Sequence, residues 1–259
     1  MSDVSVVMST NQKTNRKKLN TQLRCWTCRY GLFTADSLHN FSSNEISGLR
    51  NLRMLSMIAT IWNSTTLIPK ETAFDDYVSQ FETIISLAAT FVNDEAASSV
   101  KVASAASCPS VPLTTSPPTL NTLSLTAQLE LSSSFSSSNV PFTFEMGIIP
   151  CLYFTAIKCR CPSLRRKAIE LLSKVIPQRE GLWDSRMLGK VAARMMELEE
   201  DGCAPNRAVS TWPIEEKRIH GAYICPEYSV KGRTQQVTFA WRPHGLEGEW
   251  QAWTENIAY

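Results

Sequence analysis

The sequence predicts a mainly α-helical fold with a small C-terminal β-hairpin, a disordered N-terminal arm and a Ser/Thr/Pro-rich insertion. Three observations support this prediction. Apolar residues recur at intervals of three and four over several stretches, polar and apolar residues alternate near the C-terminus, and Ser, Thr and Pro accumulate in the middle. The 259 residues are 43% hydrophobic, which suffices for a packed core. We expect four regions, 1–44, 45–95, 96–141 and 142–259.

Residues 1–44 are polar and basic at first, and we expect an arm that is mostly disordered. The first thirty positions contain six basic residues against Asp3: Lys13, Arg16, Lys17, Lys18, Arg24 and Arg29. Such an arm can neutralise phosphates or serve as a nuclear import signal. The alternative is a solvated tail without a partner.

Two helices are predicted in residues 45–95. In the first, residues 46–62, apolar side chains recur every three residues from Ile46 to Ile61. Pro69 and Lys70 interrupt this pattern, and a second helix is expected from about Phe74 to Val92, with its aromatic residues in the core. Residues 96–141 contain repeated Ser, Thr and Pro, which cannot bury enough apolar surface to offset the entropy lost on ordering. We therefore expect a mobile linker there.

Residues 142–259 are predicted to contain three helices and the hairpin. A buried helix from Ile148 to Cys161 should end at Pro162, and Ser163 should cap the next helix. Asp184 and Ser185 are placed to cap a third helix, whose acidic C-terminal end should depend on tertiary contacts. The hairpin is expected from alternation in Lys217–Tyr228 and Gln235–Trp241, and we expect Trp241, Trp250 and Trp253 to cover the helical core.

Two motifs stand at a fixed interval in the last segment. The first contains Lys158, Cys159, Arg160, Pro162, Arg165, Arg166, Ala168, Ile169, Leu171 and Leu172, and the second contains Arg179, Glu180, Gly181, Trp183, Asp184 and Ser185. This arrangement resembles the C-terminal regulatory region of fungal zinc binuclear-cluster transcription factors, over most of Phe74 to Tyr259. The resemblance implies a helical regulatory domain attached to a DNA-binding zinc cluster.

The zinc cluster itself is expected to be vestigial. Cys25 and Cys28 are similar to the start of the family's six-cysteine motif, but Ala35 stands where the third cysteine would be, and the next cysteine is Cys108. Two thiolates cannot hold a binuclear cluster, because each zinc needs four ligands. His39 is expected to be a solvated residue. We therefore expect no metal and no other cofactor, although Cys25 and Cys28 would be ligands if a partial zinc site survives.

The remaining cysteines and the composition indicate an intracellular protein without enzymatic activity. Eight cysteines occur without a secretory signal or an uncharged apolar run long enough for a membrane span, so neutral thiols in a reducing compartment are expected. The sequence contains no glycine-rich phosphate loop, nucleophile elbow or paired histidines at a metal-binding spacing.

A basic patch is predicted where the fourth segment's first two helices meet, from Lys158, Arg160, Arg165, Arg166 and Lys167. It could bind a phosphate or an acidic partner, or it could be a solvated face with local ion pairs to Glu170 and Glu180, which we favour.

Two functions remain open at this point. In the first, the protein is a nuclear transcription-factor-like regulator with weak or no autonomous sequence-specific DNA binding. In the second, it is a non-DNA-binding interaction module that pairs with an intact transcription factor or a co-regulator. Both interpretations allow a homo- or heterodimer with a related factor, DNA contact that is weak or indirect, and no membrane association.

Overall fold

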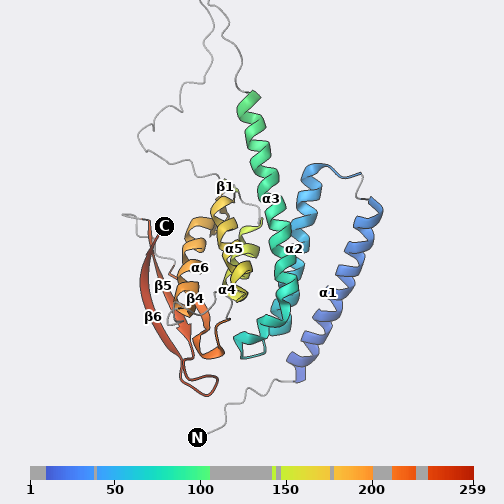
Figure 1. The fold of residues 1–259 in the computed structure, drawn as a ribbon. Helices are drawn as coiled ribbons and strands as arrows, with labels where there is room; N and C mark the ends of the chain where they lie inside the picture. Colours follow the sequence, from blue (N-terminus) through green and yellow to red (C-terminus); the bar gives the residue numbers. More distant parts are fainter. Residues whose placement is uncertain are drawn as a thin grey trace, which may run out of the picture.

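The fold consists of helices in a row with an antiparallel sheet against the last of them (Figure 1). The computed structural model describes residues 10–37, 40–105, 142–143, 147–175, 178–200, 212–225 and 233–259. Most of the expected linker, 106–141, and also Cys108, Cys203 and His39, lie outside these residues. In the described part, no helix has the length and apolar content to cross a bilayer.

The first correction concerns the N-terminal segment, which we expected to be mostly disordered. Residues Thr10–Ser37 form the helix α1, which lies beside α2 (Ser43–Thr65) in a helical hairpin (Figure 1). The side chain of Ser42 accepts a hydrogen bond from the Glu45 N–H, and the Glu45 carboxylate accepts one from the Ser42 N–H, which is a capping box at the start of α2. The expected helix 46–62 is confirmed as part of α2.

The second helical pattern begins differently from the prediction. Glu71–Tyr77 form the 3₁₀ helix η2, and the α-helix α3 runs from Val78 to Ala105. Residues 96–105, which we assigned to the linker, therefore continue α3. Its inward face contains Phe81, Ile84, Ile85, Ala88 and Val92, as the spacing predicts.

Three further helices complete the helical part: α4 (Ile149–Lys158), α5 (Pro162–Lys174) and α6 (Ser185–Glu200). Pro162 is the first residue of α5, where a proline loses no hydrogen bond, and Cys161 rather than Ser163 is the N-cap. Asp184 accepts hydrogen bonds from the N–H groups of Arg186 and Met187 and caps α6, as expected. Residues from α2, α3, α4, α5 and α6 belong to one hydrophobic core.

The C-terminal sheet has the predicted hairpin and one strand that we did not predict. Strands β4 (Ile219–Ile224), β5 (Thr234–Trp241) and β6 (Gln251–Ala258) are antiparallel in the order β4-β5-β6. Trp241 and Trp253 pack against the core, whereas Trp250 is 53% exposed and therefore does not cover it. The short η3 (Glu215–Lys217) precedes β4.

A smaller sheet explains the second sequence motif. Strand β2 (Arg179–Glu180) pairs with β1 (Phe142–Thr143) and with β3 (Trp183–Asp184). Gly181 has φ of 56° in the two-residue turn between β2 and β3, a conformation that favours glycine. Glu180 accepts hydrogen bonds from the N–H groups of Gly147, Ile148 and Ile149 at the start of α4, at 2.9, 3.1 and 3.0 Å. The motif thus joins the beginnings of α4 and α6.

Candidate functional site

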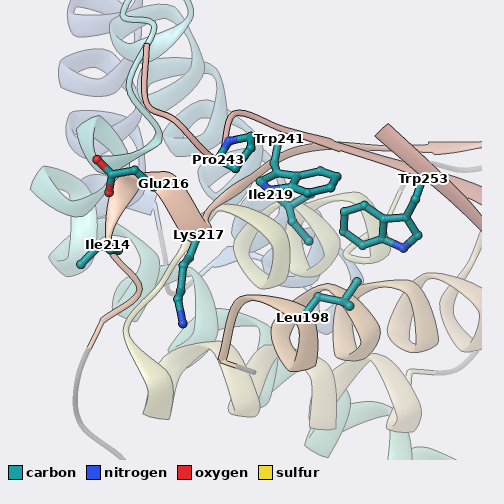
Figure 2. Close-up of a pocket in the computed structure, with 8 residues that line it drawn as sticks. All are labelled: Leu198, Ile214, Glu216, Lys217, Ile219, Trp241, Pro243 and Trp253. Carbon is teal, nitrogen blue, oxygen red and sulfur yellow. The ribbon is translucent and has the colours of Figure 1, made fainter. Parts of the chain in front are cut away.

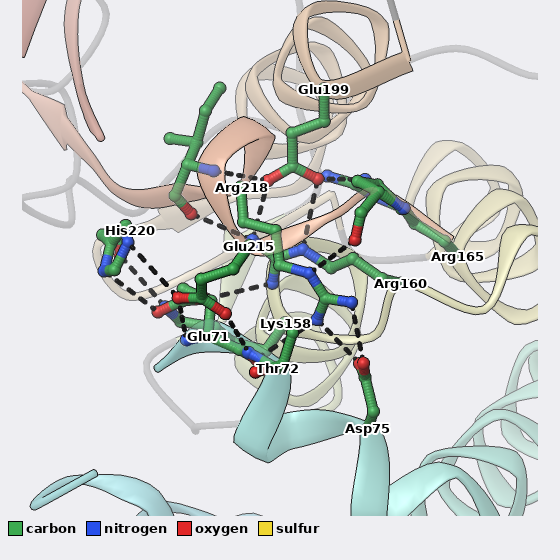
Figure 3. Close-up of polar contacts among 12 residues, drawn as sticks. Glu71, Thr72, Asp75, Lys158, Arg160, Arg165, Glu199, Glu215, Arg218 and His220 are labelled. Atoms are coloured by element: carbon green, nitrogen blue, oxygen red, sulfur yellow. Dashed lines mark hydrogen bonds and ion pairs between the residues drawn. The ribbon is translucent and has the colours of Figure 1, made fainter. Parts of the chain in front are cut away.

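The expected basic patch is divided between the interior and the surface. Lys158, Arg160 and Arg165 are buried, at 8%, 1% and 1% exposure, so the solvated-face interpretation is wrong for them. Arg166 pairs with Glu200 and Lys167 pairs with Glu170 at the surface, the second as expected. Glu180, the other expected partner, instead binds the backbone of α4. The three buried cations belong to a polar cluster shown in Figure 3.

Glu199 near the end of α6 is the centre of this cluster. Its carboxylate accepts hydrogen bonds from Arg160 at 3.1 and 2.7 Å, from Arg165 at 2.6 Å and from the Ile219 N–H at 2.7 Å. Glu199 is fully buried. Burial would raise its pKa, but the charges of Arg160 and Arg165 with these hydrogen bonds lower the pKa below the usual value. The predicted dependence of this helix end on tertiary contacts is confirmed.

A second part of the cluster is built around η2. The Glu71 carboxylate binds Lys158 Nζ at 2.7 Å and lies 3.2 Å from Arg160 Nη1. Arg218 forms a two-pronged pair with Asp75 at 2.8 and 2.7 Å. The carboxylate of Glu215 accepts hydrogen bonds from the backbone N–H groups of Glu71 and Thr72. Distant parts of the chain therefore meet in this cluster.

The charges in this cluster balance. Four cations, Lys158, Arg160, Arg165 and Arg218, are matched in number by four carboxylates, of which Glu71, Asp75 and Glu199 pair with them directly and Glu215 binds backbone N–H groups. His220 lies 4.0 Å from Glu71 and 3.8 Å from Glu215, and burial lowers its pKa despite these carboxylates. A buried cation with a bound carboxylate has little capacity for an external anion. The cluster therefore connects α4, α5, α6, η2 and β4 as a scaffold.

The N-terminal residues form a different kind of surface. Lys13, Lys17, Lys18, Arg24 and Arg29 are exposed along α1, and the half-buried Arg16 donates a hydrogen bond to the Ser64 carbonyl of α2. Cys25 and Cys28 are exposed on the same helix. Among the described residues, no three His, Cys, Asp or Glu side chains are grouped to hold a metal ion.

The other described cysteines are poor nucleophiles where they are deeply buried. Burial raises the pKa of Cys151 to about 12 and that of Cys159 to about 11. A thiol with such a pKa is protonated at pH 7. The expectation of neutral buried thiols is confirmed for these two, while Cys161 and Cys225 are half-buried.

An apolar pocket that we did not predict lies between α6 and the C-terminal sheet (Figure 2). Its volume is about 550 Å³, and it is lined by Leu198, Ile214, Glu216, Lys217, Ile219, Trp241, Pro243 and Trp253. Trp241 and Trp253 meet edge to face, with ring centres 4.5 Å apart. The sequence shows these apolar residues, but the residues that line the pocket come from separate helices and strands. Local sequence patterns cannot show that such elements meet.

Comparison with known proteins finds a relative among transcription regulators. A segment of 66 residues is 39% identical to the aspercryptin biosynthesis cluster-specific transcription regulator atnN of Emericella nidulans. This segment is 26% of the present chain and 11% of that protein, so the chain spans a small part of it. No family model and no solved structure matches the chain.

Proposed function

We propose that this protein is a nuclear regulator of transcription with weak or no autonomous sequence-specific DNA binding, and that it acts through protein partners rather than by catalysis or with a cofactor. The observation that carries the proposal is the 39% identity over 66 residues to a transcription regulator. The resemblance of the two C-terminal motifs to fungal zinc-cluster factors supports the same assignment.

The arrangement of basic residues supports the second part of the proposal. Three basic residues of the first motif, Lys158, Arg160 and Arg165, are paired with carboxylates inside the fold, whereas five of the six basic residues of α1 are exposed. Cys25 and Cys28 lie on a continuous α-helix. A surface that recognises other molecules is therefore better sought on α1 than at the C-terminal motif.

The test is a tethered reporter assay in fungal cells. The full chain is fused to an unrelated DNA-binding domain and directed to its operator upstream of a reporter gene. We expect reporter output to change relative to the DNA-binding domain on its own. A second fusion carries Glu199→Gln, which should weaken the fold and therefore reduce the change in reporter output. A wild-type fusion that is folded, nuclear and without effect on the reporter would refute the proposal.

A second candidate is an interaction module that contacts no DNA and pairs with an intact transcription factor or co-regulator. It is favoured by the position of the two cysteines on α1. The discriminating measurements are the zinc content of the purified chain and binding to a random DNA duplex across a salt series. Binding that falls steeply with salt supports DNA association through the α1 cations. Absent binding at low salt supports the module, and about two zinc ions per chain would contradict both candidates.

A further inference from the structure

The α1–α2 hairpin carries apolar side chains that the core does not use. On α1, Leu19, Trp26 and Phe33 are 43%, 36% and 52% exposed. They follow one another at intervals of seven residues, and since seven residues make nearly two helical turns, they lie in a line along the helix. We refer to these three residues as the α1 stripe.

The hairpin is held together beside this stripe, so α1 is a defined surface. The Tyr30 hydroxyl donates to the Leu49 carbonyl at 2.9 Å, and the Asn63 amide donates to Asn20 at 2.6 Å. On α2, Leu52 and Trp62 are also exposed, at 50% and 54%. Exposed apolar side chains that recur along both helices of a hairpin are typical of a protein–protein contact.

Cations flank the α1 stripe on the side away from α2. At 100° per residue, Lys18 and Arg29 lie about 80° and 60° around the helix axis from Trp26, whereas Lys13 and Arg24 lie about 140° and 160° away. All four are exposed. Residues 10–35 contain no Asp or Glu, and no described carboxylate forms an ion pair with Lys18 or Arg29.

We propose that the α1 stripe docks an amphipathic helix of a partner protein, with apolar residues along one face and acidic residues beside them. This inference rests on the proposed function and specifies the partner's chemistry. The partner's apolar face covers Leu19, Trp26 and Phe33, and its carboxylates pair with Lys18 and Arg29.

The charge distribution distinguishes this partner from two others. A second copy would bring another basic α1 against the first, and like charges beside an apolar seam disfavour pairing. A DNA duplex would satisfy the cations through its phosphates but would leave the rings of Trp26 and Phe33 uncovered. An acidic amphipathic helix satisfies both parts of the surface.

The experiment measures peptide binding to the full chain by fluorescence anisotropy. The probe is a synthetic helix of about 21 residues, with leucines along one face and glutamates beside them. The matched probe has lysines in place of the glutamates. We expect the glutamate peptide to bind and to weaken with salt, and the lysine peptide to show no binding at the same concentrations.

Two charge-reversed variants locate the site. Lys18→Glu with Arg29→Glu should weaken binding about tenfold or more, because both cations adjoin the α1 stripe. Lys13→Glu with Arg24→Glu is the matched control, with the same residue types, charge change and sequence separation, and its affinity should stay within about twofold. Phe33→Ser tests the apolar part and should also weaken binding about tenfold.

Several results would overturn the proposal. These are equal binding of the two peptides, an equal loss in both double variants, or self-association of the chain that Phe33→Ser abolishes. Stronger binding to a DNA duplex or to anionic phospholipid vesicles, lost in the Lys18/Arg29 variant, would assign the surface to those partners instead. A tethered reporter that responds, without peptide binding, would reject the partner chemistry and leave the proposed function standing. Peptide binding without a reporter response would support the partner chemistry and reject the proposed function.

Discussion

Two basic regions of this molecule have the same residue types and opposite environments. In the C-terminal motif, Lys158, Arg160 and Arg165 are buried against carboxylates from distant segments. On α1, Lys18 and Arg29 are exposed beside apolar side chains. A basic run in a sequence therefore does not identify a binding surface until the positions of the acidic residues are known.

The physical reason is that burial makes an unpaired charge very costly. Arg160 can lie in the interior because Glu199, 39 residues later, and Glu71, 89 residues earlier, both approach it. Residues 10–35 contain no acid that could play this part within α1. Long-range pairing therefore decides which basic residues become scaffold.

The largest effect is expected from Glu199→Gln. The substitution leaves Arg160 and Arg165 buried without their shared countercharge, and the free energy of unfolding should fall by about 3–5 kcal/mol. Urea unfolding followed by circular dichroism measures this change. Glu197→Gln on the same helix, at an exposed pair with Arg194, should change it by less than about 0.5 kcal/mol. Similar losses in both variants would contradict the special role of Glu199.

The next effect concerns the second motif. Glu180→Ala removes the carboxylate that accepts three backbone N–H groups at the start of α4, and we expect a loss of about 1–3 kcal/mol in unfolding free energy. The control in the same turn is Leu182→Ser, because Leu182 is 92% exposed. Should both variants unfold at the same urea concentration as the wild type, Glu180 would not be a structural residue.

Lowering the pH should remove part of the contribution that Glu199 makes to the free energy of unfolding. Because its folded pKa is lowered, this contribution is fully present above the unfolded value of 4.5 and is lost as pH falls through the folded pKa. The unfolding free energy of the wild type should therefore decline below about pH 4.5, and Glu199→Gln should flatten this decline. Urea titrations at a series of acidic pH values provide the comparison. Parallel curves would show that Glu199 does not titrate in this way.

The smallest effect is expected at the surface part of the motif. Arg166→Ala removes the ion pair with Glu200, whose side chains are 39% and 32% exposed, and the unfolding free energy should change by about 1 kcal/mol or less. The melting temperature is a sufficient measure here. A loss as large as that of Glu199→Gln would make the distinction between buried and exposed cations untenable.

The helices of the core were predictable because their patterns are local. The spacing of Phe81, Ile84 and Ala88 indicates a buried helical face, and Asp184 is a recognisable N-cap. The same applies to β4 and β5, whose alternating residues predict strands. We missed β6, because Trp250 and Trp253 suggested core coverage rather than a pairing edge.

The candidate sites were less predictable because they depend on contacts between distant residues. Nothing near Arg160 in the sequence indicates that Glu71 and Glu199 will reach it. The helix α1 was missed because its polar, basic residues suggested an unfolded arm. Its side chains form hydrogen bonds with Leu49, Asn63 and Ser64, which lie on a second helix and are far from α1 in the sequence. The stripe of Leu19, Trp26 and Phe33 becomes meaningful once that helix is placed.

The most direct test of the central claim compares two matched neutralisations in the tethered reporter assay. The claim is that the C-terminal motif is scaffold and that α1 makes the regulatory contact. At equal protein levels, Lys18→Gln with Arg29→Gln should reduce the effect on the reporter, whereas Arg166→Gln with Lys167→Gln should leave it unchanged. Loss of the effect in the α5 variant with full activity in the α1 variant would contradict this account.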